Sequence, residues 1–93
     1  MSAVGPVAQA IRTKLENAFA PETLTIRDES YLHAGHAGHN PGGESHFAVT
    51  IASASFTGKS RLERQRMVYG VLAEEMKGRI HALRLTLTAP GEI

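Results

Sequence analysis

The chain has 93 residues, a formal charge of +1 at pH 7, 42% hydrophobic residues and no cysteine. These values fit one folded domain over residues 1–93 that needs no disulfide, and they exclude an all-thiolate metal site and a thiol nucleophile. A dedicated nucleic-acid-binding protein would carry a larger basic excess, and no apolar run approaches the roughly 20 residues that span a bilayer, so we expect a soluble, cytoplasmic protein that is monomeric by itself.

The first predicted element is an amphipathic helix over residues 4–20. Its apolar residues recur at three- and four-residue spacing, and most polar residues fall elsewhere around the helix. The apolar positions are Val4, Ala8, Ile11, Leu15, Ala18 and Phe19. Pro6 is tolerated in a first turn, and Pro21 stops the helix after Ala20.

Residues 22–29 change to the two-residue period of a β-strand. Leu24 and Ile26 alternate with polar residues and lie on one face of this strand. Residues 30–44 then show no apolar period and are rich in glycine, with one proline and three histidines. This composition predicts a loop.

Two further strands and a second helix follow the loop. Apolar side chains alternate again over residues 45–54 and 81–88. Between these strands, Ser60 and Glu63 form a capping box that begins a helix. The apolar residues of this helix are Leu62, Val68, Val71, Leu72 and Met76. Gly70 in its middle costs about 1 kcal/mol relative to alanine, so we expect packing to compensate.

The element order α-β-β-α-β predicts an α+β fold with a three-stranded mixed sheet and both helices packed on one face. The first two strands should pair antiparallel, and the long helical connection implies that the second and third strands are parallel. Parallel strands begin at the same edge of a sheet. We therefore expect the loop over residues 30–44 to meet His81 at that edge.

Five histidines are the residues most in need of an explanation. His33, His36 and His39 lie in the glycine-rich loop, His46 follows it, and His81 begins the third strand. Taken singly, each has an ordinary interpretation as a solvated loop residue, a structural hydrogen-bond donor or a half-buried strand residue. Their convergence at one edge favours a metal site, because neutral imidazole suits zinc, copper, nickel and iron.

A metal site shared with another protein fits this sequence better than a stand-alone zinc or nickel site built from His33, His36 and His39. The spacing matches no zinc-finger pattern, and ordering ligands that are flanked by glycine is costly. Iron–sulfur clusters accept two imidazoles in place of two thiolates on one iron. Because this chain has no thiol, it could supply only the nitrogen ligands, and the sulfur ligands would come from a partner.

Five short motifs occur in order along the chain. They are Asp28-Glu29-Ser30-x-x-His33, Gly-Gly-Glu44-Ser45-His46-Phe47, Phe56-x-Gly58-Lys59, Arg64-Gln-Arg66-x-Val68-Tyr69 and Ile80-His81-Ala82-Leu83. Together they resemble the BolA family over about residues 11–90, which is nearly the whole chain. The resemblance implies a single BolA-like domain with an α-β-β-α-β fold related to the class II KH domain.

The resemblance also implies a function. BolA-like proteins form complexes with monothiol glutaredoxins that carry a bridging [2Fe–2S] cluster, in which glutaredoxin and glutathione supply the sulfur. The family's cluster ligand near the start of the final strand corresponds to His81. The second ligand lies in the loop and corresponds by position to His33, with His36 and His39 as alternatives.

Three further residues are expected to support these ligands. His46 should fix the exit of the loop, and the carboxylates of Glu29 and Glu44 could orient the imidazoles. Nothing near them resembles an activated nucleophile or a recognised catalytic spacing, so we do not expect an enzyme.

A basic cluster near the start of the second helix suggests a different function. Its members are Lys59, Arg61, Arg64 and Arg66. Some BolA relatives are described as DNA-binding transcriptional regulators, so DNA is the alternative partner. The ordinary interpretation is a solvated helix face, since Glu63 interrupts the cluster. The same surface could instead contact an acidic patch, or the carboxylates of glutathione, in a glutaredoxin complex.

Overall fold

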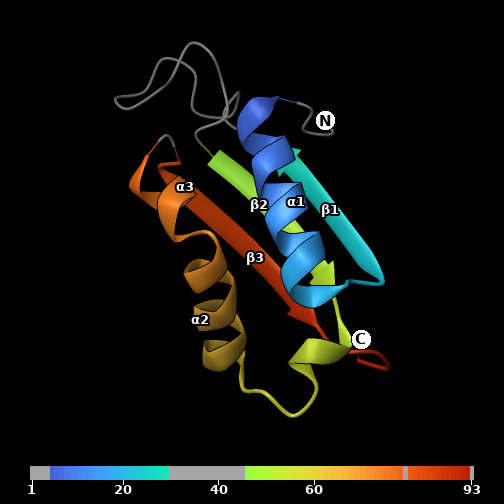
Figure 1. Cartoon of the computed structure of the whole chain (residues 1–93). Coiled ribbons are helices and arrows are strands. Elements are labelled where there is room, and N and C mark those ends of the chain that lie inside the picture. Colours follow the sequence, from blue (N-terminus) through green and yellow to red (C-terminus); the bar gives the residue numbers. More distant parts are fainter. Residues whose placement is uncertain (1–4, 30–45, 79, 93) are drawn as a thin grey trace.

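The computed structural model describes residues 5–29, 46–78 and 80–92, which form a three-stranded sheet with the helices on one side (Figure 1). The elements are α1 (Pro6–Phe19), β1 (Thr23–Asp28), β2 (His46–Ala52), the 3-10 turn η2 (Ala54–Phe56), α2 (Arg61–Val71), α3 (Ala73–Lys77) and β3 (Ala82–Thr88). This confirms the predicted α+β class and element order, except that the second helix is split in two. None of the described helices is long and apolar enough to cross a membrane.

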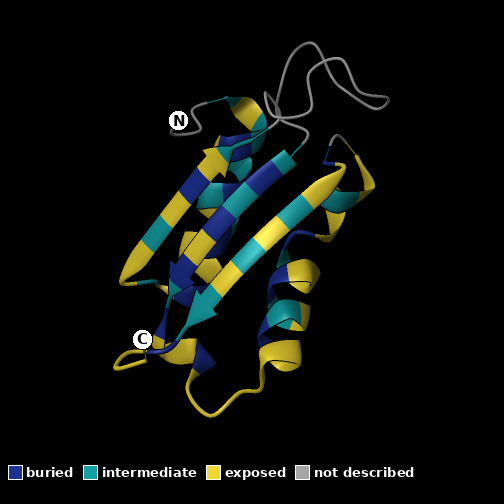
Figure 2. Ribbon diagram, turned by 180° about the vertical axis from the view of Figure 1, so that it is seen from behind, coloured by how far each residue is buried: buried dark blue, intermediate teal, exposed yellow. Residues whose placement is uncertain are grey.

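Strand β2 is the central strand of the sheet, as the connection lengths predict. It pairs antiparallel with β1, with Ile51 opposite Leu24, and parallel with β3, with Val49 opposite Leu85. Buried and more exposed residues alternate along β2 (Figure 2), because successive side chains point to opposite faces of a strand. The face of the sheet that is turned away from the helices is not covered by any described element.

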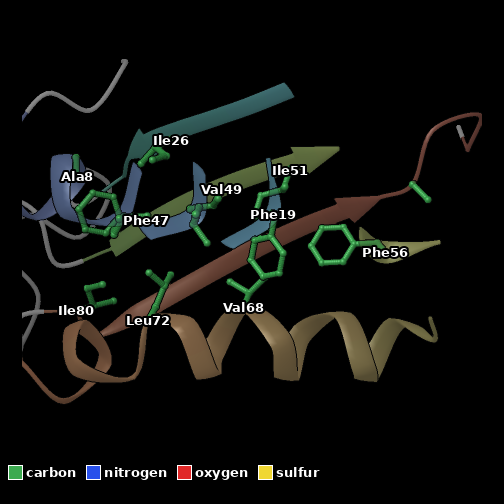
Figure 3. Close-up of a cluster of buried hydrophobic side chains, with 13 residues drawn as sticks. Ala8, Phe19, Ile26, Phe47, Val49, Ile51, Phe56, Val68, Leu72 and Ile80 are labelled. Carbon is green, nitrogen blue, oxygen red and sulfur yellow. The ribbon is translucent and has the colours of Figure 1, made fainter. Parts of the chain in front are cut away.

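The hydrophobic core lies between the sheet and the helices (Figure 3). The central strand contributes three core residues that are at most 2% exposed: Phe47, Val49 and Ile51. From the other side, Phe19 and Phe56 bring their ring centroids within 5.1 Å of each other. The core residues of the helices are Ala8, Ile11, Leu15, Phe19, Val68 and Leu72. Burial of each large side chain here contributes about 1.5–3 kcal/mol to the stability of the folded state, so the core holds the sheet firmly against the helices.

The second helix begins as predicted but is not continuous as far as Met76. Ser60 Oγ accepts from the Glu63 N–H at 3.1 Å, and Glu63 Oε1 accepts from the Ser60 N–H at 2.8 Å, which confirms the capping box. The helix is interrupted at Leu72, whose φ of −99° and ψ of 20° depart from helical values. Leu72 itself is fully buried, so the interruption lies where the chain is anchored in the core.

The core-facing side of α2 differs from the predicted one at its first turn. Arg64, Val68 and Leu72 are the residues at four-residue spacing that face inward, whereas Leu62 is 54% exposed. Leu62 precedes Val68 by six residues, which places it on a different side of a helix with 3.6 residues per turn. Gly70 itself faces open space, since an added Cβ there would meet no described atom within 4 Å, and the helix is packed through Val68 and Leu72 instead.

Strand β2 ends at Ala52, two residues before the predicted end, because Ser53 is the N-cap of the 3-10 turn η2 that follows. Ser53 is fully buried, and its Oγ accepts from the Ser55 N–H at 3.1 Å. The same hydroxyl donates to the Phe19 carbonyl at 2.6 Å. It thereby satisfies one of the last carbonyls of α1, which have no partner within the helix.

Candidate functional site

Two histidines meet at the edge of the sheet where β2 and β3 begin. His46 is the first residue of β2, and His81 directly precedes β3. The register places His46 opposite Ala82, so the neighbouring His81 lies beside it. Their ring centroids are 5.9 Å apart and the ring planes differ by 14°, a stacked arrangement. His81 is exposed and His46 is half-buried, so of the two side chains that of His81 is the more accessible from solvent.

The segment over residues 30–45 is joined to the described fold at this same edge. Glu29 follows β1, and its N–H donates to the His46 carbonyl at 2.7 Å. The chain therefore leaves and re-enters the sheet beside His81, as the topology predicts. The predicted residues that lie outside the described part of the chain are His33, His36, His39 and Glu44.

His46 has a more central place than its predicted supporting role. The sequence predicts a structural residue at the loop exit, because the contact of His46 with His81 arises only from the pairing of β2 with β3. Among the described residues, no group of three or more histidine, cysteine, aspartate or glutamate side chains could hold a metal ion. Within the described part of the chain, the two imidazoles are therefore not joined by further candidate metal ligands.

Arg84 is a residue near this edge that the sequence did not single out. Its Nη2 donates to both carboxylate oxygens of Glu29, at 2.8 and 2.7 Å. The Arg84 side chain is 71% exposed and that of Glu29 only 14%, and the hydrogen bond to Glu29 raises the pKa of Arg84. The two residues are 55 positions apart in the sequence, so the position of Arg84 on the predicted third strand is the only sequence signal for this contact. Glu29, predicted to orient an imidazole, is engaged by this arginine.

The basic cluster lies at the opposite end of β3, and one of its members is built into the fold. The Arg64 guanidinium donates to Glu92 through Nη1 and Nη2, at 2.6 and 2.7 Å. It also donates to the carbonyls of Lys59 and Leu87, at 3.0 and 3.2 Å. Arg64 is only 9% exposed. Arg64 therefore occupies a core-facing helix position and has hydrogen-bond partners within the chain, and its role as a contact to a nucleic acid or partner stays a prediction.

The Arg64–Glu92 pair also changes the acidity of the glutamate. Hydrogen bonds from Arg64, and then from the Ala89 N–H, lower the pKa of Glu92 from its ordinary value of 4.5 to about 2. The same pairing raises the pKa of Arg64. Charge-assisted hydrogen bonds of this two-point kind are stronger than neutral ones, which explains the direction of both shifts.

The other basic residues of the cluster remain exposed. Lys59 and Arg61, together with Arg64 and Gln65, line a cavity of about 430 Å³ whose other wall is formed by residues 85–87 of β3. Arg66 is exposed but does not line this cavity. The cluster predicted from sequence thus divides into one arginine held by the fold, two exposed cations at a cavity and one exposed cation that does not line it.

Comparison with known proteins places this geometry in a family. The family model described as BolA-like protein matches residues 15–92. BolA-like protein 1 of Homo sapiens is 49% identical over 90 residues, which cover 97% of this chain and 63% of that protein. The DNA-binding transcriptional regulator BolA of Escherichia coli is 46% identical over 79 residues, which cover 85% of this chain and 71% of that protein.

Solved structures agree with the sequence matches. The BolA domain of SufE1 from Arabidopsis thaliana is 41% identical and superposes with a TM-score of 0.88, covering 98% of this chain and all of that domain. The chain spans less than two thirds of the length of the BolA-like protein 1 relatives that it matches. The family match, the identities and the shared fold together show that this chain belongs to the BolA-like protein family.

Proposed function

We propose that this chain is a non-enzymatic adapter that binds a monothiol glutaredoxin and co-ligates a bridging [2Fe–2S] cluster, in cluster assembly, trafficking or iron sensing. The observation that carries the proposal is the stacked pair of His46 and His81 at the edge where residues 30–45 join the sheet. Membership of the BolA-like family supports it.

The ligand roles follow from the chemistry of the chain. His81 holds one position on the cluster, and His33 holds the second, with His36 and His39 as alternatives. His46 becomes a further competitor because its ring already lies against that of His81. With no cysteine in the chain, glutaredoxin and glutathione provide the sulfur ligands. The bound cluster supplies iron for transfer or for sensing, and the imidazoles set how firmly this chain holds it.

The test is reconstitution of the complex under anaerobic conditions. The chain is mixed with a monothiol glutaredoxin, glutathione, iron and sulfide, and visible circular dichroism is recorded. We expect a spectrum that differs from that of glutaredoxin alone and that is lost in His81→Ala. Parallel His33→Ala, His36→Ala, His39→Ala and His46→Ala variants identify the second ligand. Arg27→Ala, on the exposed face of β1, is the matched control. If the spectrum of the complex with His81→Ala still differs from that of glutaredoxin alone in the same way, the proposal is contradicted.

DNA binding is the second candidate function, and the exposed cations at the end of β3 favour it. Lys59 and Arg61 line the cavity, and the Escherichia coli relative is named as a DNA-binding transcriptional regulator. Phosphate contacts release counterions, so affinity should fall steeply with salt. Fluorescence anisotropy with a labelled duplex would show a weaker complex and a smaller salt slope for Arg61→Ala. Absence of binding at low salt contradicts this function.

A further inference from the structure

Strand β3 forms one edge of the sheet, and its backbone groups divide between the two sides of the strand. The Ser53 N–H donates to the Thr88 carbonyl at 3.0 Å, so Thr88 points its carbonyl toward β2. In a parallel pair, residues of one parity bond to the neighbouring strand and residues of the other parity point away. Leu83, Leu85 and Leu87 therefore direct their N–H and C=O groups outward, toward α2.

The ends of this outward-facing edge are occupied by side chains. The Leu87 carbonyl accepts from Arg64, and the Leu83 carbonyl accepts from the Tyr69 hydroxyl at 3.4 Å. Beyond them, the Ala89 N–H donates to Glu92 at 3.0 Å. Within the described chain, no group is placed on the outward N–H and C=O of Leu85 between them. An unpaired strand edge of this kind is a template for pairing with another chain.

The open stretch of β3 faces the cavity of about 430 Å³ described above. Leu85, Thr86 and Leu87 form one wall, and the start of α2, which lies beside β3 (Figure 1), forms the other. Lys59 and Arg61 stand on that second wall, are exposed, and have no acidic partner among the described ion pairs. Arg64 adds a charge that Glu92 balances, so the cavity is positive overall.

We propose that this groove binds an extended acidic peptide segment of a partner protein, which adds to β3 as a fourth strand. An extended peptide presents alternating donors and acceptors, which match the outward N–H and C=O of Leu85 and the N–H of Leu87. Its carboxylates meet Lys59 and Arg61. This site lies at the opposite end of β3 from His81, and its occupation does not require the cluster.

A nucleic acid satisfies the same groove less well. Phosphate oxygens would accept from the cations and from backbone N–H groups, but they leave the outward carbonyl of Leu85 without a donor. The residues lining the cavity include no aromatic side chain on which a base could stack. The strand edge therefore favours a peptide, whereas the cations alone would suit either ligand.

Amide hydrogen exchange of the intact ¹⁵N-labelled chain tests strand addition directly. In the free protein, the amides of Arg84 and Thr86 should exchange slowly and those of Leu85 and Leu87 quickly. A synthetic octapeptide in which valine alternates with glutamate is then added. We expect the Leu85 and Leu87 amides to become protected, with little change at Arg84 and Thr86. Chemical-shift changes without new protection at Leu85 and Leu87 overturn the proposal.

Peptide and protein variants separate strand pairing from charge attraction. Two versions of the octapeptide carry N-methyl groups on alternate amides and so block one edge each; one should bind and the other should not. Equal binding of both overturns strand addition. Lys59→Glu combined with Arg61→Glu should weaken binding about tenfold, whereas Arg27→Glu, on β1, should change it less than about twofold.

Competition with a single-stranded DNA oligonucleotide distinguishes a peptide ligand of the groove from a nucleic-acid ligand. The oligonucleotide should fail to protect the Leu85 amide and should not displace the peptide at equal concentration. An oligonucleotide that binds the groove while the octapeptide does not overturns the peptide assignment. Neither result depends on glutaredoxin or on iron, so failure here is distinguishable from failure of the cluster proposal.

Discussion

The two ends of the parallel strands β2 and β3 use their polar residues in different ways. At the starting end, His46 and His81 are stacked on each other and His81 is exposed. At the finishing end, Arg64 is 9% exposed and tied to Glu92 by two hydrogen bonds. One end therefore keeps an imidazole exposed at the surface, whereas the other holds its most buried cation in contacts within the fold.

This difference shows that basic residues close together in a sequence can differ in whether their side chains are exposed to a ligand or held within the fold. Three positively charged residues lie close together in the sequence, yet only Lys59 and Arg61 are exposed, whereas Arg64 is buried. What separates them is the helix face: Arg64 shares the inward face of α2 with Val68 and Leu72. Substitutions at the two ends should therefore affect different measurements.

Replacing His81 should have the largest functional effect and almost no structural effect. We expect His81→Ala to abolish the visible circular dichroism of the cluster-bound glutaredoxin complex. Because the side chain is exposed, its loss should change the free energy of unfolding by less than about 0.5 kcal/mol. Urea denaturation measures the second quantity, with Lys77→Ala as the control. A large loss of stability in His81→Ala would show that this end also serves the fold.

Replacing Arg64 should give the reverse pattern. Arg64→Ala leaves the carbonyl of Leu87 without its side-chain donor and removes both guanidinium hydrogen bonds of the Glu92 carboxylate, so the midpoint of thermal unfolding should fall by several degrees. The cluster-bound complex should still form below that midpoint. Arg61→Ala is the matched control and should leave the midpoint nearly unchanged, because Arg61 is exposed. Equal effects of the two substitutions would remove the distinction between structural and free cations.

Acid titration should show the contribution of Glu92. Its pKa falls from 4.5 to about 2 on folding, so the folded state favours the ionised carboxylate. The stabilisation is complete above pH 4.5 and is lost as the pH falls from 4.5 toward 2. Glu92→Gln should flatten this part of the stability curve, measured by chemical denaturation at several pH values. An unchanged acid limb in Glu92→Gln would contradict the assigned role of the ion pair.

The smallest expected effect is at Gly70, which belongs to neither end. A Cβ at Gly70 would meet no described atom within 4 Å, so Gly70→Ala should stabilise the protein by about 0.5–1 kcal/mol through helix propensity. Gly58→Ala is the contrasting variant, because Gly58 has a φ of 75° that favours glycine, and it should destabilise. A destabilising Gly70→Ala would point to a contact at this position with a partner or with the undescribed residues.

The strands and most of the core were predictable from local pattern alone. The alternation of Phe47, Val49 and Ile51 predicted β2 and its buried face, and Ser60 with Glu63 predicted where α2 begins. The interruption at Leu72 was not predictable, because no proline or capping residue marks it. Leu62 was placed on the wrong side of the helix, since Arg64 occupies an inward position that an apolar residue usually fills.

The candidate site was predictable in its location but not in its composition. The topology placed His81 at the edge where the loop ends, and the structure puts His46 there as its neighbour. Arg84 and its contact with Glu29 were missed, because a pairing across 55 residues depends on strand register. The residues that the family likeness singles out in the loop, His33, His36 and His39, stay a prediction.

The sequence by itself determined the order and approximate bounds of the strands and helices, that the first two strands are antiparallel, and that the chain can offer nitrogen but no thiolate sulfur to a metal. These properties follow from residue period, connection length and composition, which are local. Only the tertiary structure decided that His46 stacks on His81, that Glu92 neutralises Arg64, and that no described residue pairs with the edge of β3 at Leu85. Each of these depends on the register and packing of elements far apart in the chain, which no local pattern specifies.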